Sequence, residues 1–223
     1  MLNWFDMKKI CILADSLAAP REDNIADAAR WPQVLFSQIQ PVEYINRVKG
    51  ASTTKKVKKL VGVEADIFII QLGIVDCAPR LFTRFESKQL ARLPQSWREK
   101  IIKWAKENRQ PSTERAYVKP NKFEKNLKRI LRIANGSSVI FIKIINSGEE
   151  MLKNNPSIQQ QIDLYNSIIE RMVSIDNNVS IITIPDESIE EITLDDGYHL
   201  NEQGHQVVAN LVVDQVNQIL RAR

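Results

Sequence analysis

The sequence predicts an α/β protein, a three-layer α/β/α sandwich built on a five-stranded parallel sheet with one helical insertion. Five short apolar runs of strand length recur along the 223 residues. Segments with the apolar spacing of helices alternate with these runs, which is typical of a parallel sheet covered on both faces. One connection, at about 78–120, is too long for a simple link between a strand and a helix. Since one α/β domain commonly reaches ~250 residues, we expect a single domain over residues 1–223.

The expected strands are Ile10–Ala14, Val42–Val48, Asp66–Leu72, Ser138–Ile145 and Val179–Ile184. The first of them is apolar without alternation, so we expect it to be buried on both faces. It ends abruptly at Asp15 and Ser16. Ligands of open α/β sheets collect beyond the carboxyl ends of the strands, which makes the Ser16 hydroxyl a candidate nucleophile. An equally good alternative is that Ser16 caps the helix that follows.

Capping residues and helical spacing mark the connections between the strands. Trp31 and Pro32 open the first helix, with Pro32 in its first position. Ser52 or Thr53 caps a short lysine-rich helix that runs through Leu60. Apolar residues at helical spacing indicate three further helices, within Phe123–Ala134, Ile158–Met172 and Val208–Leu220.

The long insertion differs in composition from the rest of the chain, with four prolines and two tryptophans. Ser96 and Glu99 have the spacing of a capping box, which predicts a helix that runs to about Glu107. We therefore expect a helical insertion near the mouth of the site. Trp97 and Trp104 lie seven residues apart and share one face of this helix. Packing against the body of the protein is the ordinary explanation for such a pair, and substrate binding is the alternative.

The net charge of +4 is spread unevenly. Four lysines cluster within residues 55–59, and residues 80–132 are rich in lysine and arginine. A solvated surface is the ordinary explanation for such runs, and an anionic substrate or a membrane surface is the sharper one. No recognisable nucleic-acid-binding motif accompanies the charge, so we expect no nucleic acid partner.

The N-terminal residues and the cysteines bear on the compartment. The N-terminus has an acid before its lysines and lacks a long apolar core, unlike a signal peptide. No run approaches the ~20 apolar residues of a membrane span, so we expect a cytoplasmic protein without an integral membrane segment. Cys11 and Cys77 belong to opposite ends of parallel strands and are expected to be free thiols. With two cysteines and two histidines, we expect no structural zinc, no other metal and no cofactor.

The two histidines, His199 and His205, both lie between the fifth expected strand and the last helix. Asp196 precedes His199 by three residues, a spacing that lets the carboxylate accept the Nδ1 proton and leaves Nε2 to take a proton from a serine. The alternative is that Asp196 caps the last helix beside a surface histidine. His205 falls within the start of that helix, and we expect it to be structural.

Three blocks taken together resemble the SGNH hydrolases, also called the GDSL family. They are Ala14-Asp-Ser-Leu17, Gly73-x-x-Asp76 and Asp196-x-x-His199, in the family's order and spacing, and the resemblance spans nearly the whole chain. It implies the flavodoxin-like fold of that family. It also implies a serine nucleophile at Ser16, a histidine base at His199 and an acid at Asp196. Ala14 stands where the family usually has glycine, which is a mild departure.

The resemblance also implies an oxyanion hole, and here the sequence departs from the family. The expected backbone donors are the N–H groups of Ser16 and Gly50. The family's third block normally includes an asparagine whose amide donates as well, but this chain has Val75 there. Losing one such donor typically costs about 3 kcal/mol of transition-state stabilisation. Arg80 is our candidate to replace it or to bind an acidic substrate, and an ion pair with Asp76 is the alternative role.

The function implied by the resemblance is that of a serine esterase, which works through an acyl-enzyme on small acyl groups carried by carbohydrate or lipid. The basic insertion favours an anionic saccharide or glycolipid ester, with Asp76 and Arg80 in the substrate-binding region, and deacetylation is the expected reaction. An O-acyltransferase would use the same three residues with an alcohol as acceptor. A binding module of this fold with weak or no catalysis is the third possibility, motivated by Val75.

Overall fold

The computed structural model describes residues 7–108, 116–186 and 189–222. Its centre is a five-stranded sheet with the order β2-β1-β3-β4-β5, in which every neighbouring pair is parallel. The strands are β1 (Lys8–Ala14), β2 (Val42–Asn46), β3 (Ile67–Gln71), β4 (Ser138–Ile142) and β5 (Val179–Ile182). The predicted number, order along the chain and direction of the strands are confirmed.

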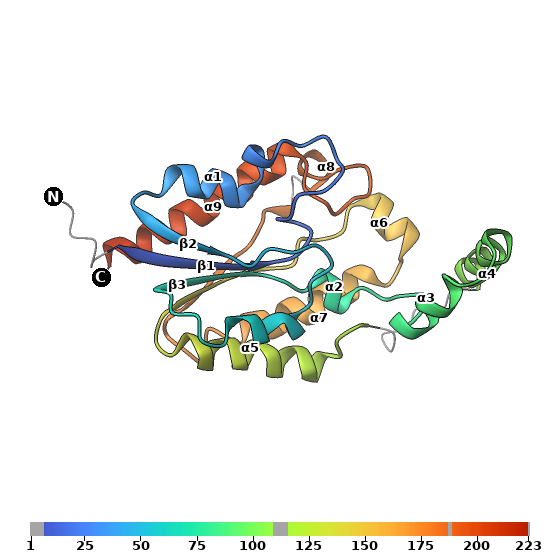
Figure 1. Ribbon diagram of the computed structural model, residues 1–223, viewed down its shortest axis with the longest axis horizontal. Coiled ribbons are helices and arrows are strands. Elements are labelled where there is room, and N and C mark those ends of the chain that lie inside the picture. The colour runs from blue at the N-terminus through green and yellow to red at the C-terminus, as the bar shows by residue number, and fades with distance from the viewer. Residues whose placement is uncertain (1–6, 109–115, 187–188, 223) are drawn as a thin grey trace.

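Helices cover both faces of the sheet. The longer ones are α1 (Trp31–Gln38), α4 (Gln95–Glu107), α5 (Pro120–Ala134), α7 (Ile158–Glu170) and α9 (Glu202–Arg221). The shorter ones are η2 (Asp27–Ala29), η3 (Thr54–Leu60), α2 (Ile74–Cys77), α3 (Arg84–Leu90), α6 (Glu149–Asn154) and α8 (Ile189–Ile192). Figure 1 shows α1 and α9 on one face of the sheet and α5 and α7 on the other. The predicted three-layer α/β/α sandwich is therefore confirmed.

The core strands are buried because they have neighbours on both edges and helices on both faces. Every residue of β3 and β4 is buried, as are the last five of β1. The predicted fourth strand ran to Ile145, but β4 ends at Ile142. Beyond it the Asn166 amide takes the place of a strand partner, accepting from the Ile144 N–H at 2.8 Å and donating to the Ile144 carbonyl at 2.9 Å. Apolar residues therefore continue past the strand without continuing the ladder.

One predicted helix cap is wrong, and another is correct in its residue but lacks the side-chain hydrogen bond. The helix of the insertion begins at Gln95 with Pro94 as N-cap, and Glu99 accepts a hydrogen bond from the Gln95 side chain instead of closing a capping box. A capping box is present one helix earlier, where Thr83 and Glu86 exchange hydrogen bonds at the start of α3. At η3 the N-cap residue is one of the two expected, Thr53, but its side chain makes no cap hydrogen bond.

Residues 83–107, which we call the insertion arm, project away from the sandwich. Figure 1 shows α3 and α4 beyond the edge of the sheet at which α2 lies. No residue of α4 is buried. Trp97 and Trp104 are 66% and 65% exposed, so the prediction that they pack against the body is wrong.

The two ends of the insertion meet at one point on the body. The Arg80 guanidinium lies over the Tyr117 ring, 5.1 Å from its centroid. The Val118 N–H donates to the Asp76 carbonyl at 3.3 Å, and the Asn155 side chain donates to the Pro79 carbonyl at 3.2 Å. These contacts fasten both ends of the insertion beside α2.

Two further expectations concern the thiols and the membrane. Cys11 and Cys77 are free thiols, as predicted, and both are buried. Burial raises the pKa of the Cys11 thiol to about 11. In the part of the chain that the structure describes, we find no helix with the length and apolar character needed to cross a bilayer.

Gly204, in the first turn of α9, lies so close to the backbone of Ile192 that no side chain fits between them. Its N–H donates to the side chain of the N-cap residue Asn201, and a Cβ placed on it would overlap the backbone carbonyl oxygen of Ile192. We expect Gly204→Ala to lower the free energy of unfolding by about 3 kcal/mol, because backbone must shift to make room. Urea unfolding measures this. The exposed Gln206→Ala in the same helix is the control, and equal midpoints for both variants would contradict the prediction.

Candidate active site

Ser16 lies in a tight turn at the end of β1. The Asp15 N–H donates to the Gln71 carbonyl at 3.2 Å, which extends the pairing with β3 by one residue. The Asp15 side chain then accepts from the Leu17 N–H at 3.0 Å, and its carbonyl accepts from Ala18 and Ala19. The turn leaves Ser16 half-buried at the carboxyl edge of the sheet. The alternative that Ser16 caps a following helix is wrong, because the next helical element begins only at Asp27.

The loop between α8 and α9 is closed by its own hydrogen bonds, which place Asp196 and His199. The Leu194 N–H donates to the His199 carbonyl at 2.7 Å, and Gly197 makes the turn between them with a φ of +72°. Asp196 Oδ1 accepts from the backbone N–H groups of Tyr198 and His199 at 3.2 and 2.9 Å. The cap of α9 is Asn201, so the alternative that Asp196 caps this helix is wrong.

The three predicted side chains meet at this edge. His199 Nδ1 lies 2.6 Å from Asp196 Oδ2, and His199 Nε2 lies 3.2 Å from Ser16 Oγ. A carboxylate can only accept, so Nδ1 carries the proton and Nε2 presents a lone pair to the serine hydroxyl. His199 is 7% exposed, which excludes the surface histidine considered above. This geometry allows proton transfer from Ser16 to His199.

The environment favours a neutral His199 beside an ionised Asp196. Burial lowers the pKa of His199, and the hydrogen bond and charge of Asp196 offset only part of this, so that the net pKa lies below its ordinary 6.5. Partial burial raises the pKa of Asp196, but the hydrogen bonds from the backbone and ring of His199 outweigh it and the net pKa is lowered. A base that is neutral at neutral pH can accept the serine proton.

Two further carboxylates are buried below the turn. Burial raises the pKa of Asp15 to about 7, and the neighbouring charge of Asp76 adds to this effect. Asp76 is fully buried and accepts from the Thr54 N–H at 3.0 Å and from the Thr54 hydroxyl at 2.6 Å. Asn126 donates to the same hydroxyl at 2.9 Å. Asp76 therefore fixes the start of η3, and its interior position does not support the predicted contact with substrate.

Arg80, in contrast to Asp76, is only half-buried. It contacts the Tyr117 ring and also lies near Tyr198. Burial and the charge of Asp196 raise the pKa of the Tyr198 phenol, and the positive charge of Arg80 opposes this rise. The Tyr198 ring in turn lies 3.9 Å from the His199 ring, centroid to centroid. Arg80 thus stands at the side of the candidate site, half-buried and at the base of the insertion.

The residues expected at the oxyanion hole differ in their exposure and in what they can donate. Gly50 is exposed in the turn after β2, and the N–H of its neighbour Lys49 donates to the Ala14 carbonyl at 3.1 Å, which sets this turn beside the end of β1. Val75 is 7% exposed within α2, and its side chain has no donor to offer. Val75 therefore cannot supply the side-chain hydrogen bond that an asparagine at this position would donate.

A polar network behind Asp196 was missed by the sequence prediction. Arg21 Nη1 lies 4.0 Å from Asp196 Oδ2, and Arg21 also faces Asp23 at 3.6 Å. Asp23 pairs at 2.7 Å with Arg30, which is 2% exposed and reaches His205 Nε2 at 3.5 Å. Burial and Arg30 lower the pKa of His205 to about 4. His205 is structural, as predicted, and the nearness of Arg21 and Asp23 to Ser16 in sequence was the available signal.

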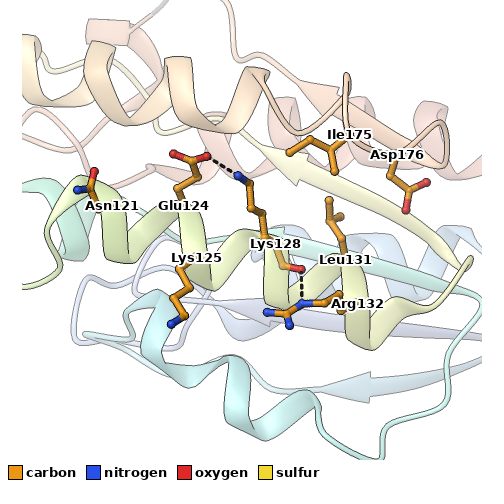
Figure 2. Close-up of a pocket in the computed structure, with 8 residues that line it drawn as sticks. All are labelled: Asn121, Glu124, Lys125, Lys128, Leu131, Arg132, Ile175 and Asp176. Carbon is orange, nitrogen blue, oxygen red and sulfur yellow. Dashed lines mark hydrogen bonds and ion pairs between the residues drawn. The ribbon is translucent and has the colours of Figure 1, made fainter.

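A sizeable cavity lies away from these groups. It has a volume of about 630 Å³ and lies along α5. Figure 2 shows an ion pair between Glu124 and Lys128 at this cavity. Its lining contains none of the three residues described above. We therefore locate the candidate site by its side-chain geometry and not by cavity size.

Comparison with known proteins finds likeness at the level of structure. No family model matches the sequence, and no curated protein matches it. A lipase/acylhydrolase from Enterococcus faecalis is 18% identical, with a TM-score of 0.63 over 94% of this chain and 95% of that one. The psychrotrophic esterase EstA from Pseudoalteromonas sp. is 14% identical, with a TM-score of 0.59 over 96% and 99%. A carbohydrate acetylesterase family member from Sinorhizobium meliloti is 12% identical, with a TM-score of 0.60 over 96% and 99%. The chain therefore has the fold of these lipolytic and esterase structures.

Proposed function

We propose that this protein is a serine esterase with Ser16 as nucleophile, His199 as general base and acid, and Asp196 as the orienting carboxylate. The observation that carries the proposal is the continuous contact from Asp196 through His199 to Ser16, at 2.6 and 3.2 Å. Because the hydroxyl and the imidazole come from opposite ends of the chain, local structure alone does not account for their meeting. The fold shared with esterases and lipases agrees with the proposal.

In the proposed reaction Ser16 Oγ attacks the ester carbonyl carbon while His199 Nε2 takes the hydroxyl proton. The bond to the alcohol oxygen then breaks, and His199 returns the proton to the departing alcohol. Water attacks the resulting acyl-enzyme with His199 again as base, which releases the carboxylic acid and restores Ser16. The Asp196 carboxylate stabilises the imidazolium form in both steps.

The oxyanion of each tetrahedral intermediate requires hydrogen-bond donors. We assign this role to the backbone N–H groups of Ser16 and Gly50, with the Arg80 guanidinium as the nearby cation. A cation beside the acyl group also favours an acidic substrate. The basic insertion and the carbohydrate acetylesterase among the similar structures together support small acyl esters of anionic saccharides or glycolipids as the substrate class.

Fluorophosphonate labelling tests the proposal directly, since the probe reacts only with an activated hydroxyl. We expect the wild-type protein to be labelled at Ser16 in a peptide map. Ser37→Ala, which removes an exposed hydroxyl on α1, is the matched control and should label like the wild type. Absence of label on folded wild-type protein would contradict the esterase and favour the second candidate, a non-catalytic binding module, for which Val75 is the supporting observation.

The acid limb of the pH profile follows from the environment of His199. The base must be neutral to accept the Ser16 proton, so kcat/KM rises as pH passes upward through the His199 pKa. Since burial holds that pKa below 6.5, we expect half-maximal activity below pH 6.5. Hydrolysis of a chromogenic acetate ester from acid to neutral pH measures this. A midpoint above 6.5 would show that His199 is charged more readily than its burial implies.

A further inference from the structure

We propose that the insertion arm is a docking surface for an anionic lipid bilayer. Three apolar side chains of α4 share one face: Trp97, Ile101 and Trp104 follow one another at intervals of four and three residues, which keeps them in line on a helix. Leu93, just before the helix, and Phe85 in α3 are exposed as well. Trp97 and Trp104 are about two-thirds exposed, Ile101 is half-buried, and α4 buries none of its residues.

The charges of α4 suit a membrane surface better than a protein groove. The 13-residue helix has four cations and two acids, and Lys100, Lys103 and Lys106 are exposed. A helix with tryptophans on one face and lysines around it lies in the plane of the bilayer interface, with the rings at headgroup depth and the ammonium groups against anionic lipids.

The position of the arm relative to Ser16 also supports the proposal. It leaves the body beside α2, which follows β3, the neighbour of β1 at the carboxyl edge of the sheet. Figure 1 shows the arm extending outward from this edge. Ser16 stands at the same edge. A bilayer bound by α4 would therefore lie beyond the edge of the sheet at which Ser16 stands.

A second copy of the chain is a weaker match for this face. Three side chains of this size bury about 500 Å² on each partner, which is less than the ~800 Å² typical of a stable interface. Pairing two α4 helices would also set their exposed lysines near one another, and like charges repel. An anionic bilayer can bury the apolar side chains and also attract the lysines.

Cosedimentation of the full chain with lipid vesicles tests the proposal. The wild type should pellet with vesicles of phosphatidylcholine and phosphatidylglycerol in equal parts and not with phosphatidylcholine alone. Trp97→Ser with Trp104→Ser should weaken binding at least about tenfold through lost apolar burial. Lys100→Gln with Lys103→Gln should weaken it about 25-fold, since one cation near an anionic bilayer contributes roughly fivefold. Tryptophan emission should shift to the blue on vesicles in the wild type and not in the Trp97/Trp104 variant.

Matched controls separate docking from general effects. Val61→Ser removes a comparably exposed apolar side chain from the body, and Lys8→Gln with Lys9→Gln removes two cations at the far end of β1; both should bind like the wild type. Three results would overturn the proposal: no binding of folded wild type to anionic vesicles, equal binding by the Trp97/Trp104 variant, or a dimer in sedimentation that this variant dissolves. None of these measurements depends on ester hydrolysis.

Discussion

Hydrolysis of a chromogenic acetate ester is expected to fall at least about 10⁴-fold in Ser16→Ala and by a similar factor in His199→Ala. The reason is the 3.2 Å contact between Ser16 Oγ and His199 Nε2, through which the hydroxyl loses its proton as it attacks. Without the serine there is no nucleophile, and without the imidazole the hydroxyl keeps its proton. The measurement is kcat for each purified variant, with thermal unfolding to show that each is folded.

The double variant distinguishes this mechanism from two independent contributions. Residues that act as one unit lose almost all activity when either is removed, so Ser16→Ala with His199→Ala should be no slower than either single variant. Losses that multiply in the double variant would show that the two side chains do not act together. A single variant that keeps most of the wild-type rate would remove its residue from the mechanism.

Asp196→Asn is expected to lower kcat by about 10⁴-fold while leaving the protein folded. The asparagine carbonyl can still accept from the backbone N–H groups of Tyr198 and His199, which preserves the loop. Its amide, however, donates toward His199 Nδ1, which favours the tautomer with the proton on Nε2. That nitrogen can then no longer accept the Ser16 proton.

The neighbouring Asp195→Asn provides the matched control for this variant. It removes an exposed carboxylate one residue away and is expected to stay within about twofold of wild-type kcat, since an exposed charge makes a small contribution. Similar losses in both variants would indicate that negative charge in the loop, and not the hydrogen bond to the ring, supports activity. The assay is the same ester hydrolysis at a pH above the His199 pKa.

The fold could be predicted because the positions of the apolar residues indicate the lengths of the strands and the spacing of the helices. The first four residues of β3 (Ile67–Gln71) are all apolar, which is typical of a strand covered on both faces. The ends of strands were less predictable: Ile144 is apolar, but its backbone pairs with an asparagine side chain from α7. Periodicity likewise shows that Trp97 and Trp104 share a face, but it does not show what that face meets.

The site was predictable in part for a similar reason. Asp196 and His199 lie three residues apart and form their contact within one loop, so spacing alone suggests it. The interactions of Arg21 and Arg30 depend on how the loop after Ser16 folds against α9, which no local pattern specifies. The role of Asp76 was also hidden, because its partner Thr54 is 22 residues away in another connection.

The contact between Arg80 and Tyr117 bears on how the sequence of this chain can evolve. A segment that departs from the body and returns at a single spot can grow, shrink or be exchanged without shifting the register of any strand. Selection for the surface that the protein binds can therefore act on the insertion, while selection for the bond that it cleaves acts on the body.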